Sequence, residues 1–381
     1  MVRVNPVLAA MGGNPVTGVQ DLARSLRDRG EPLIDFSIGD PREPTPEFVR
    51  RALQSAVPEI SQYPTTKGLA ELRLAMAGYV RRRFGVDVDP DTQVLPTTGS
   101  KEAIFSTPLA FVDRDSADAV VWATPGYPIY RRGALLAGAR PVEIPLGGDF
   151  VFRPEHVLDD DWKDARIVWL CSPHNPTGAV TPPEVISSFV ERSREVDALI
   201  CADECYVDLY SEEAPASVLQ FAGDGAAGVL AYFSLSKRSG MTGYRSGAVV
   251  GDPDAISALV KLRQGTGTAP PEFTQAAAIA AWADDAHVVE RREIFNEKRR
   301  VLMEAFARAG LEVIGSSAGL YLWVRVGDDV AAAERLLRAG VVVSPGRAFG
   351  PGGEGHLRLA LVPGVAECER AAAAVVRALA D

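Results

Sequence analysis

Residues 229–245 read VLAYFSLSKRSGMTGYR. The apolar run that opens this stretch predicts a buried strand, which ends where Ser234 and Lys237 begin a polar segment. Two earlier stretches repeat the pattern, IVWLCSPHNPTG at 167–178 and LICADECY at 199–206. Parallel strands bring their carboxyl ends to one edge of a sheet, and open α/β sheets bind ligands there. The polar groups that follow these three strands are therefore expected to share one site.

Outward from these strands, apolar runs and helical patterns alternate between about residues 95 and 250. Further strands are predicted at 119–123 and 247–250, and amphipathic helices at 69–83 and 100–111. This alternation is typical of an α/β fold in which a mostly parallel, mixed sheet is flanked by helices.

The chain after residue 285 follows a different pattern. Helices are predicted at 288–309 and 330–338, and short strands at 311–314, 321–326, 341–344 and 356–361. These elements indicate a smaller α+β domain. We therefore expect three parts in this chain of 381 residues: an N-terminal arm that contributes to the small domain (1–44), a large domain (45–285) and a C-terminal small domain (286–381).

Composition narrows the class of protein. Hydrophobic residues make up 47% of the chain and charged residues 24%, with a mean hydropathy of +0.02, as in ordinary globular proteins. The net charge of −10 argues against a nucleic-acid partner, because binding to phosphates needs a basic face. The N-terminal residues hold no apolar run of the kind found in secretion signals, and no stretch is long and apolar enough to span a bilayer. No membrane partner and a cytoplasmic location are the resulting expectations.

Four cysteines, at 171, 201, 205 and 368, are too few and too irregularly spaced for a disulfide framework. Cys201 and Cys205 frame Asp203 and Glu204, which raises a metal site as an alternative. Two thiols do not complete a tetrahedral site, and the histidines lie far off in the sequence. Buried strand cysteines are the preferred interpretation, and no metal is expected.

The polar groups at the strand ends match the needs of a pyridine cofactor with an aldehyde and a phosphate. Such a cofactor needs a lysine, an anion beside its ring nitrogen, donors to its phenolic oxygen, and cations or free amides at its phosphate. The chain offers these in turn as Lys237, Asp203, Asn175 with Tyr206, and Arg245 with the helix start Gly99-Ser100-Lys101. A helix start suits a phosphate because its N–H groups are free and because it is the positive end of the helix dipole.

Each of these residues has a structural explanation when taken alone. Asp203 could cap a helix, and Asn175-Pro176 is also a common turn signal. Their joint order along the chain, each at a predicted strand end or helix start, favours the cofactor.

From Ile38-Gly39-Asp40-Pro41 to Arg358, the chain resembles the fold type I pyridoxal-phosphate (PLP) enzymes, and within them the class I/II aminotransferases. The resemblance implies that Lys237, in a Ser-x-Ser-Lys motif, carries the cofactor as a Schiff base and shuttles the proton. It also implies the roles of the other cofactor contacts, namely Asp203 at the ring nitrogen, Asn175 and Tyr206 at the phenolic oxygen, Tyr127 stacked on the ring, and Gly99, Ser100, Lys101, Ser234, Ser236 and Arg245 at or beside the phosphate. Catalysis is expected to rest on Lys237, Asp203 and Tyr206.

The same resemblance implies substrate and partner contacts. Arg358 matches the arginine that holds the substrate α-carboxylate, for which a guanidinium offers two parallel donors. Gly39 and Asn175 would contribute to that pocket. Tyr63 matches a tyrosine that reaches the phosphate of the neighbouring subunit, which implies a homodimer with shared active sites.

Short motifs at 38–46 and 236–239 look most like those of bacterial N-succinyldiaminopimelate aminotransferases of lysine biosynthesis. The expected donor is N-succinyl-LL-diaminopimelate, with 2-oxoglutarate and glutamate as the partner pair. Arg42 is a candidate for the distal carboxylate, although an arginine in such a loop is more often a solvated charge. An aspartate, LL-diaminopimelate or broad-specificity aminotransferase and a PLP-dependent β-lyase stay open as alternatives. A PLP-binding regulator is disfavoured by the acidic charge and by the lack of a DNA-binding extension before residue 40.

Overall fold

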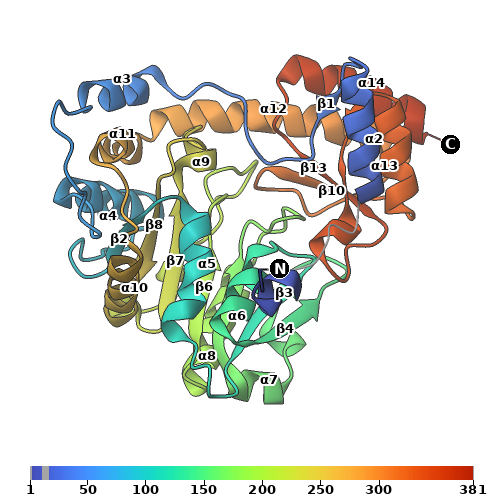
Figure 1. The fold of residues 1–381 in the computed structure, drawn as a ribbon. Coiled ribbons are helices and arrows are strands. Elements are labelled where there is room, and N and C mark those ends of the chain that lie inside the picture. The colour runs from blue at the N-terminus through green and yellow to red at the C-terminus, as the bar shows by residue number, and fades with distance from the viewer. Residues whose placement is uncertain (1, 11–16, 381) are drawn as a thin grey trace.

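The computed structural model describes residues 2–10 and 17–380. A seven-stranded sheet forms the centre of the molecule, in the order β2-β8-β7-β6-β5-β3-β4 (Figure 1). Its strands are β2 (Val94–Thr97), β3 (Ala119–Thr124), β4 (Arg140–Pro145), β5 (Ala165–Cys171), β6 (Leu199–Asp203), β7 (Val229–Ser234) and β8 (Gly247–Gly251). Of these seven strands, β8 alone runs opposite to the other six, so the prediction of a mostly parallel, mixed sheet is confirmed.

Two strands of this sheet were not predicted. β2 and β4 are the edge strands, and they contain Pro96, Pro141 and Pro145. Proline cannot donate to a sheet and is tolerated at edges, so both strands lack the unbroken apolar run of the central strands.

Helices cover both faces of the large sheet (Figure 1). The helices of this large part are α3 (Glu47–Ser55), α4 (Ala70–Phe84), α5 (Ser100–Phe111), α6 (Ile129–Ala137), α7 (Asp159–Asp164), α8 (Pro183–Glu195), α9 (Leu235–Arg238), α10 (Pro253–Thr266) and α11 (Glu272–Ala283), of which α3 packs on α11 and not on the sheet. The strands are apolar on both faces. On β3, Val121 joins one core cluster while its neighbours Val120 and Trp122 join another, as a strand buried between two helical layers requires.

The small part of the molecule is built around a four-stranded antiparallel sheet in the order β12-β13-β10-β9. Its strands are β9 (Val313–Ile314), β10 (Tyr321–Arg325), β12 (Ser344–Pro345) and β13 (His356–Ala360). The helices of this region are α2 (Thr17–Asp28), α12 (Ala286–Arg308), α13 (Asp329–Arg338) and α14 (Val365–Leu379). Figure 1 shows α12 as the long helix that runs from the large part into the small one. A further helix, α1, spans Pro6–Ala10, and short 3-10 turns lie at Pro154–His156, Val218–Gln220, Asp224–Ala226 and Gly346–Phe349.

The predicted strand at 341–344 is wrong as a single element. It consists of β11 (Val341–Val342), which pairs in parallel with β1 (Ile34–Asp35), and of β12, which pairs with β13. The chain changes partners between the two, and a pattern of apolar residues cannot reveal such a change. Val19, Ala23 and Phe36 pack into the core of the small part. The division at residues 44 and 285 stays a prediction.

Among the described residues, none of the helices has both the length and the apolar character that crossing a membrane requires.

Candidate active site

A cavity of about 690 Å³ lies at the carboxyl ends of β5, β6 and β7. Twelve of the predicted site residues line it: Gly39, Ser100, Lys101, Tyr127, Asn175, Asp203, Tyr206, Ser234, Ser236, Lys237, Arg245 and Arg358. Residues that were not predicted to bind the cofactor or substrate complete the wall, among them Ser37, Asp40, Cys205, Tyr321 and Phe349. The structure therefore brings the three strand ends together as expected.

Lys237 enters the cavity from α9, the short helix that directly follows β7. The helix starts at Ser234, whose side chain accepts a hydrogen bond from the backbone N–H of Ser236 at 3.1 Å. Lys237 Nζ donates to the backbone carbonyl of Gly39. Burial lowers the pKa of Lys237 to about 8, so a substantial part of the amine is neutral near physiological pH.

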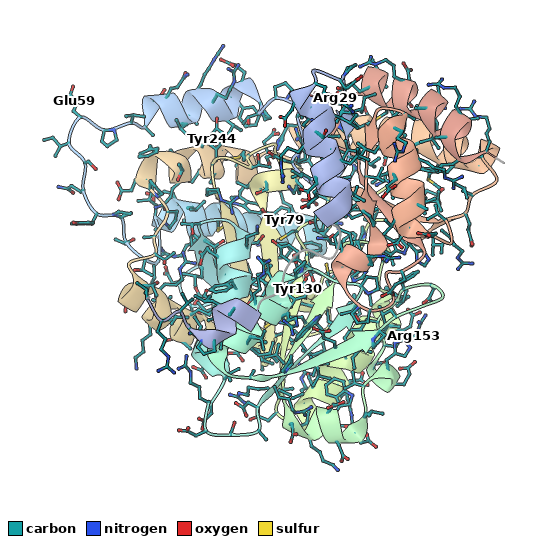
Figure 2. The ribbon with its side chains drawn as sticks, turned by 45° about the vertical axis from the view of Figure 1, so that its right-hand side comes forward. Arg29, Glu59, Tyr79, Tyr130, Arg153 and Tyr244 are labelled. Carbon is teal, nitrogen blue, oxygen red and sulfur yellow. The ribbon has the colours of Figure 1, made fainter. Side chains whose placement is uncertain are left out.

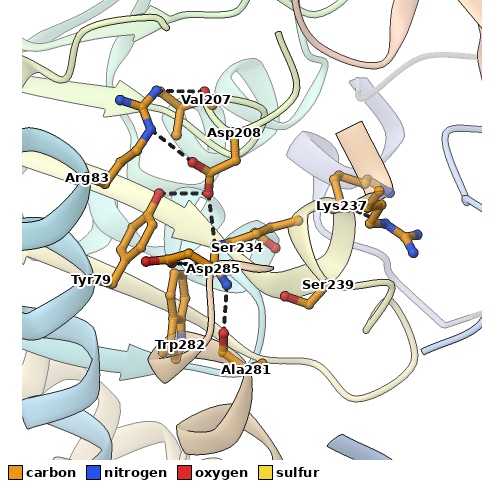
Figure 3. Close-up of polar contacts among 12 residues, drawn as sticks. Tyr79, Arg83, Val207, Asp208, Ser234, Lys237, Ser239, Ala281, Trp282 and Asp285 are labelled. Carbon is orange, nitrogen blue, oxygen red and sulfur yellow. Dashed lines mark hydrogen bonds and ion pairs between the residues drawn. The ribbon is translucent and has the colours of Figure 1, made fainter. Parts of the chain in front are cut away.

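The next residue, Arg238, anchors α9 to the body of the protein. Its buried guanidinium donates to Asp208 Oδ2 at 2.9 Å, to the Ala281 carbonyl at 2.7 Å and to Asp285 Oδ1 at 2.6 Å. Figure 3 shows Tyr79 and Arg83 converging on the same Asp208 carboxylate. A buried ion pair of this kind is costly to break, so the helix that carries Lys237 is held in place.

A second contact holds the backbone of Lys237 from another direction. Arg291 Nε, on α12, donates to the Lys237 carbonyl at 2.9 Å. Gly240 leaves room for this arginine, because a Cβ atom there would lie 2.8 Å from Arg291 Nη1. Neither Arg238 nor Arg291 was predicted, because the groups that each of them binds lie far away in the sequence.

Asp203 ends β6 and is buried. Its carboxylate accepts hydrogen bonds from Tyr130 Oη at 2.9 Å and from the Cys205 N–H at 3.4 Å. No arginine, lysine or histidine in the described part of the chain pairs with it, and burial raises its pKa. A buried carboxylate without a cationic partner suits the protonated ring nitrogen of a pyridine. Tyr130 was missed, although its position three residues after Tyr127 is a signal that could have revealed it.

Two tyrosines, Tyr206 and Tyr321, lie together in the cavity wall. Tyr206 Oη and Tyr321 Oη are 3.0 Å apart, and burial raises the pKa of both side chains. Tyr127 lines the cavity and meets Tyr130 edge to ring, with centroids 5.7 Å apart. Tyr321 was not predicted, because it comes from β10 and only the folded chain places it beside Tyr206.

The start of α5 forms a cradle with Arg245. Gly99 precedes the helix with a φ of +83°, and a Cβ atom there would lie 2.3 Å from Arg245 Nη2. Gly99 is not among the residues that line the cavity, but its missing side chain allows the guanidinium to approach the helix start. Ser100, Ser234 and Ser236 complete the cradle, which has the free amides, hydroxyls and positive charge that suit a phosphate.

Arg358 points a buried guanidinium into the cavity from β13. It donates to the Ser37 carbonyl at 2.6 Å and to Asn175 Oδ1 at 3.2 Å, while its Nε has no partner. The rings of Phe349 and Tyr321 cover it at 4.4 and 4.5 Å. No carboxylate pairs with it in the described residues, so its charge is available to a ligand.

Besides Gly99, two more predicted residues do not line the cavity. Tyr63 is fully exposed between α3 and α4, on the segment that carries Glu59 away from the body of the molecule in Figure 2. Arg42 is half exposed and lies 3.7 Å from Glu367, as expected for a solvated charge.

The two cysteines considered for a metal have different environments. Cys201 is buried in β6, whereas Cys205 lies beyond the strand and lines the cavity. The interpretation of both as buried strand residues is therefore wrong for Cys205. Within the described residues, no three His, Cys, Asp or Glu side chains are arranged to hold a metal ion.

Comparisons with known proteins bear on this site. The family model described as aminotransferase class I and II matches residues 31–375. The LL-diaminopimelate aminotransferase of Aquifex aeolicus is 36% identical over 344 residues, which cover 88% of each chain. The 4-dedimethylamino-4-oxo-anhydrotetracycline transaminase of Streptomyces rimosus is 38% identical, over 91% of this chain and 92% of its own.

Solved structures of aminotransferases are also similar to this chain. An aminotransferase from Neisseria meningitidis superposes with a TM-score of 0.92 at 32% identity, over 99% of this chain and all of its own. A probable N-succinyldiaminopimelate aminotransferase from Thermus thermophilus gives 0.89 at 29% identity, over 95% of this chain and 99% of its own. The predicted fold class is confirmed by these matches.

Proposed function

Because the chain belongs to the class I and II aminotransferase family, we propose that it moves the amino group of a diaminopimelate-type donor to 2-oxoglutarate, with Lys237 as the cofactor-bearing residue. Members of this family use PLP and act on an amino acid and a 2-oxo acid. One observation carries the assignment of the site. A half-buried amine (Lys237), a buried carboxylate (Asp203) and a buried guanidinium (Arg358) line the same cavity, and within the described residues neither Asp203 nor Arg358 has a partner of opposite charge.

These residues fit PLP. The unpaired carboxylate of Asp203 would accept from the ring nitrogen, and the cradle at Gly99 and Arg245 would hold the phosphate. Asn175 and Tyr206 would bond the phenolic oxygen, and Tyr127 would lie against the ring. When bound, the cofactor supplies an aldehyde for the amino group and a ring that takes up the electron pair left at the substrate carbon.

The chain's own residues then bind, orient and move protons. Arg358 holds the α-carboxylate of the donor through two parallel N–H groups, which fixes the direction of its Cα–H bond. The neutral amine of Lys237 takes the proton from that carbon and later returns a proton as general acid. Asp203 keeps a proton on the ring nitrogen, because its negative charge is compensated by no other cation of the cavity wall.

The proposed donor follows from the relatives and from one cation of the cavity. The names of two similar proteins share diaminopimelate, as the free LL form and as its N-succinyl derivative. Lys101 lines the cavity and forms no ion pair within the described residues, whereas Arg42 lies outside. The resemblance implied a place for Lys101 at or beside the phosphate; we propose instead that Lys101, and not Arg42, binds the distal carboxylate of the donor. N-succinyl-LL-diaminopimelate stays our first choice.

A donor panel tests this proposal. We expect kcat/KM with 2-oxoglutarate to be higher for N-succinyl-LL-diaminopimelate and LL-diaminopimelate than for aspartate. Lys101→Met should lower kcat/KM for the diaminopimelate donors more than for norleucine, which has no distal carboxylate. Arg42→Met is the matched control and should change neither. If aspartate exceeds both diaminopimelate donors, the donor proposal is wrong, while membership of the family is unaffected.

We further propose that the enzyme is a homodimer. Tyr63 is fully exposed and distant from the cavity of its own chain, so it can contribute to a site only on a partner subunit.

A further inference from the structure

A second cavity, of about 590 Å³, shares no lining residue with the active site. One wall comes from α12 and includes Arg299, Arg300 and Met303. The facing walls come from the segment after β6, with Glu212 and Glu213, and from the loop at 315–317. The site and the mechanism derived above use none of these residues.

Arg299 is unusual among the residues of this cavity because it is 4% exposed. It donates to Asn296 Oδ1 at 2.5 Å and to the Gly319 carbonyl at 2.7 Å, and its Nε has no hydrogen-bond partner among the described residues. These acceptors are neutral, so they do not compensate its charge. Burial lowers the pKa of Arg299 to about 10, which leaves the guanidinium charged at neutral pH.

A comparison with the other buried cations of the described chain shows what Arg299 lacks. Five of the seven are paired with a carboxylate: Arg73 with Asp91, Arg238 with Asp208, Arg263 with Glu102, and Arg291 and Lys298 with Glu43. The two without one are Arg358 and Arg299. Arg358 is the residue assigned to the carboxylate of the substrate, and Arg299 has the same features in a different cavity. Burial of a guanidinium without a carboxylate costs free energy, unless a ligand supplies the negative charge.

The facing wall limits the ligand. Glu212 and Glu213 are exposed and form no ion pair with any residue that the structure describes, whereas Glu304 pairs with Arg300 at 2.8 Å. A simple carboxylate would be drawn to Arg299 but repelled by these glutamates. A molecule that also carries an ammonium group satisfies both walls. We propose that this cavity binds a free amino acid, with its carboxylate on Arg299 and its ammonium group toward Glu212 and Glu213.

Calorimetric titration of the holoenzyme tests the proposal. The cofactor is first reduced onto Lys237 with borohydride, so that added amino acids cannot react. The common L-amino acids are then titrated one by one into the wild type, Arg299→Gln and Arg300→Gln. We expect at least one amino acid to bind at millimolar concentration or below, with an affinity about tenfold lower in Arg299→Gln, because a charged hydrogen bond is lost. Arg300→Gln is the matched control, since it changes a neighbouring arginine that already has carboxylate partners, and it should leave the affinity unchanged.

The glutamates provide an independent variant in case Arg299→Gln does not fold. Both are exposed, so Glu212→Gln combined with Glu213→Gln should fold normally. This variant should weaken binding of the amino acid but not of the analogue that lacks the amino group, such as 4-methylpentanoate in place of L-leucine. The proposal would be overturned if the double glutamate variant bound the amino acid as tightly as the wild type does. The same affinity in a folded Arg299→Gln variant would also overturn it. So would the absence of any binding in the wild type.

Discussion

Burial changes the chemistry of Lys237 and Asp203 in opposite directions. It disfavours charge on both, which lowers the pKa of the amine and raises that of the carboxyl. The amine thereby becomes a nucleophile and base near neutral pH. The carboxylate of Asp203 needs a cationic partner, and the neutral hydroxyl of Tyr130 that donates to it does not supply one.

The pH dependence of cofactor uptake should reflect the lowered pKa of Lys237. Only the neutral amine attacks an aldehyde, so the rate at which apoenzyme takes up PLP should rise with pH and level off above about 8. Stopped-flow absorbance of the bound cofactor measures this rate. A midpoint near that of free lysine, about 10.4, would show that burial does not perturb the amine.

Asp203→Asn should keep the fold and much of the bound cofactor but lose about 10²-fold or more in kcat, the range found when one preorganised electrostatic contact is removed. The neutral amide no longer favours a proton on the ring nitrogen. Tyr130→Phe is the matched control, because it removes only a hydrogen bond to the same carboxylate, and its loss should be smaller. Steady-state kinetics give kcat, and the visible spectrum gives the amount of bound cofactor. Near-normal turnover of Asp203→Asn would show that Asp203 is a structural residue.

Two helices, α5 and α9, position residues of the site. α5 directs its start at the cavity, and the turn before it has no space for a side chain at Gly99. α9 is short, and it is Arg238 and Arg291 that hold it between the large part and α12. The position of Lys237 thus depends on helices far from it in the sequence.

Gly99→Ala should weaken PLP binding without unfolding the protein. The added Cβ would collide with the Arg245 guanidinium, at 2.3 Å, and displace the positive group from the phosphate cradle. Equilibrium binding of PLP to apoenzyme should show a dissociation constant raised by about tenfold or more, as expected for a weakened charged hydrogen bond.

Gly85→Ala is the control for this substitution. Gly85 also has a positive φ, +71°, but open space around its Cα atom. It should therefore lose stability through backbone strain alone and keep its affinity for PLP. Equal PLP affinity in both variants would mean that the clash at Gly99 does not affect the cradle.

At the scale of the whole molecule, the cavity lies between two parts of the chain. Gly39, Tyr321 and Arg358 come from segments that pack with the small part, and the other groups come from the large sheet. The segment with Tyr63 projects away from both, as Figure 2 shows for Glu59. A site completed by a second subunit accounts for a tyrosine that is fully exposed in one chain.

Mixing two inactive variants tests the proposed homodimer. Lys237→Ala removes the amine of its own site, and Tyr63→Phe is expected to impair the site of the partner subunit. In a mixed dimer one site contains both substitutions and the other contains neither. If the two sites act independently, each mixed dimer should therefore have as much as about half of the activity of a wild-type dimer. Activity assays after joint refolding measure this recovery. An enzyme that is fully active as a monomer in sedimentation experiments would contradict the proposal.

Local sequence patterns determined the five inner strands of the large sheet and the chemistry at its edge, but not the two edge strands. Apolar runs such as 199–203, each followed by polar residues, are local features, and the strand ends they mark do meet in one cavity. Only the tertiary structure decided which distant groups complete the site: Tyr130 on Asp203, Asn175 on Arg358, and Arg291 on the carbonyl of Lys237. It also placed Arg42 outside the cavity and revealed that Arg299 has no carboxylate partner within the described residues. The physical reason is that periodicity reports which face of an element is buried, whereas a partner for a buried charge is selected by packing between elements far apart in the chain.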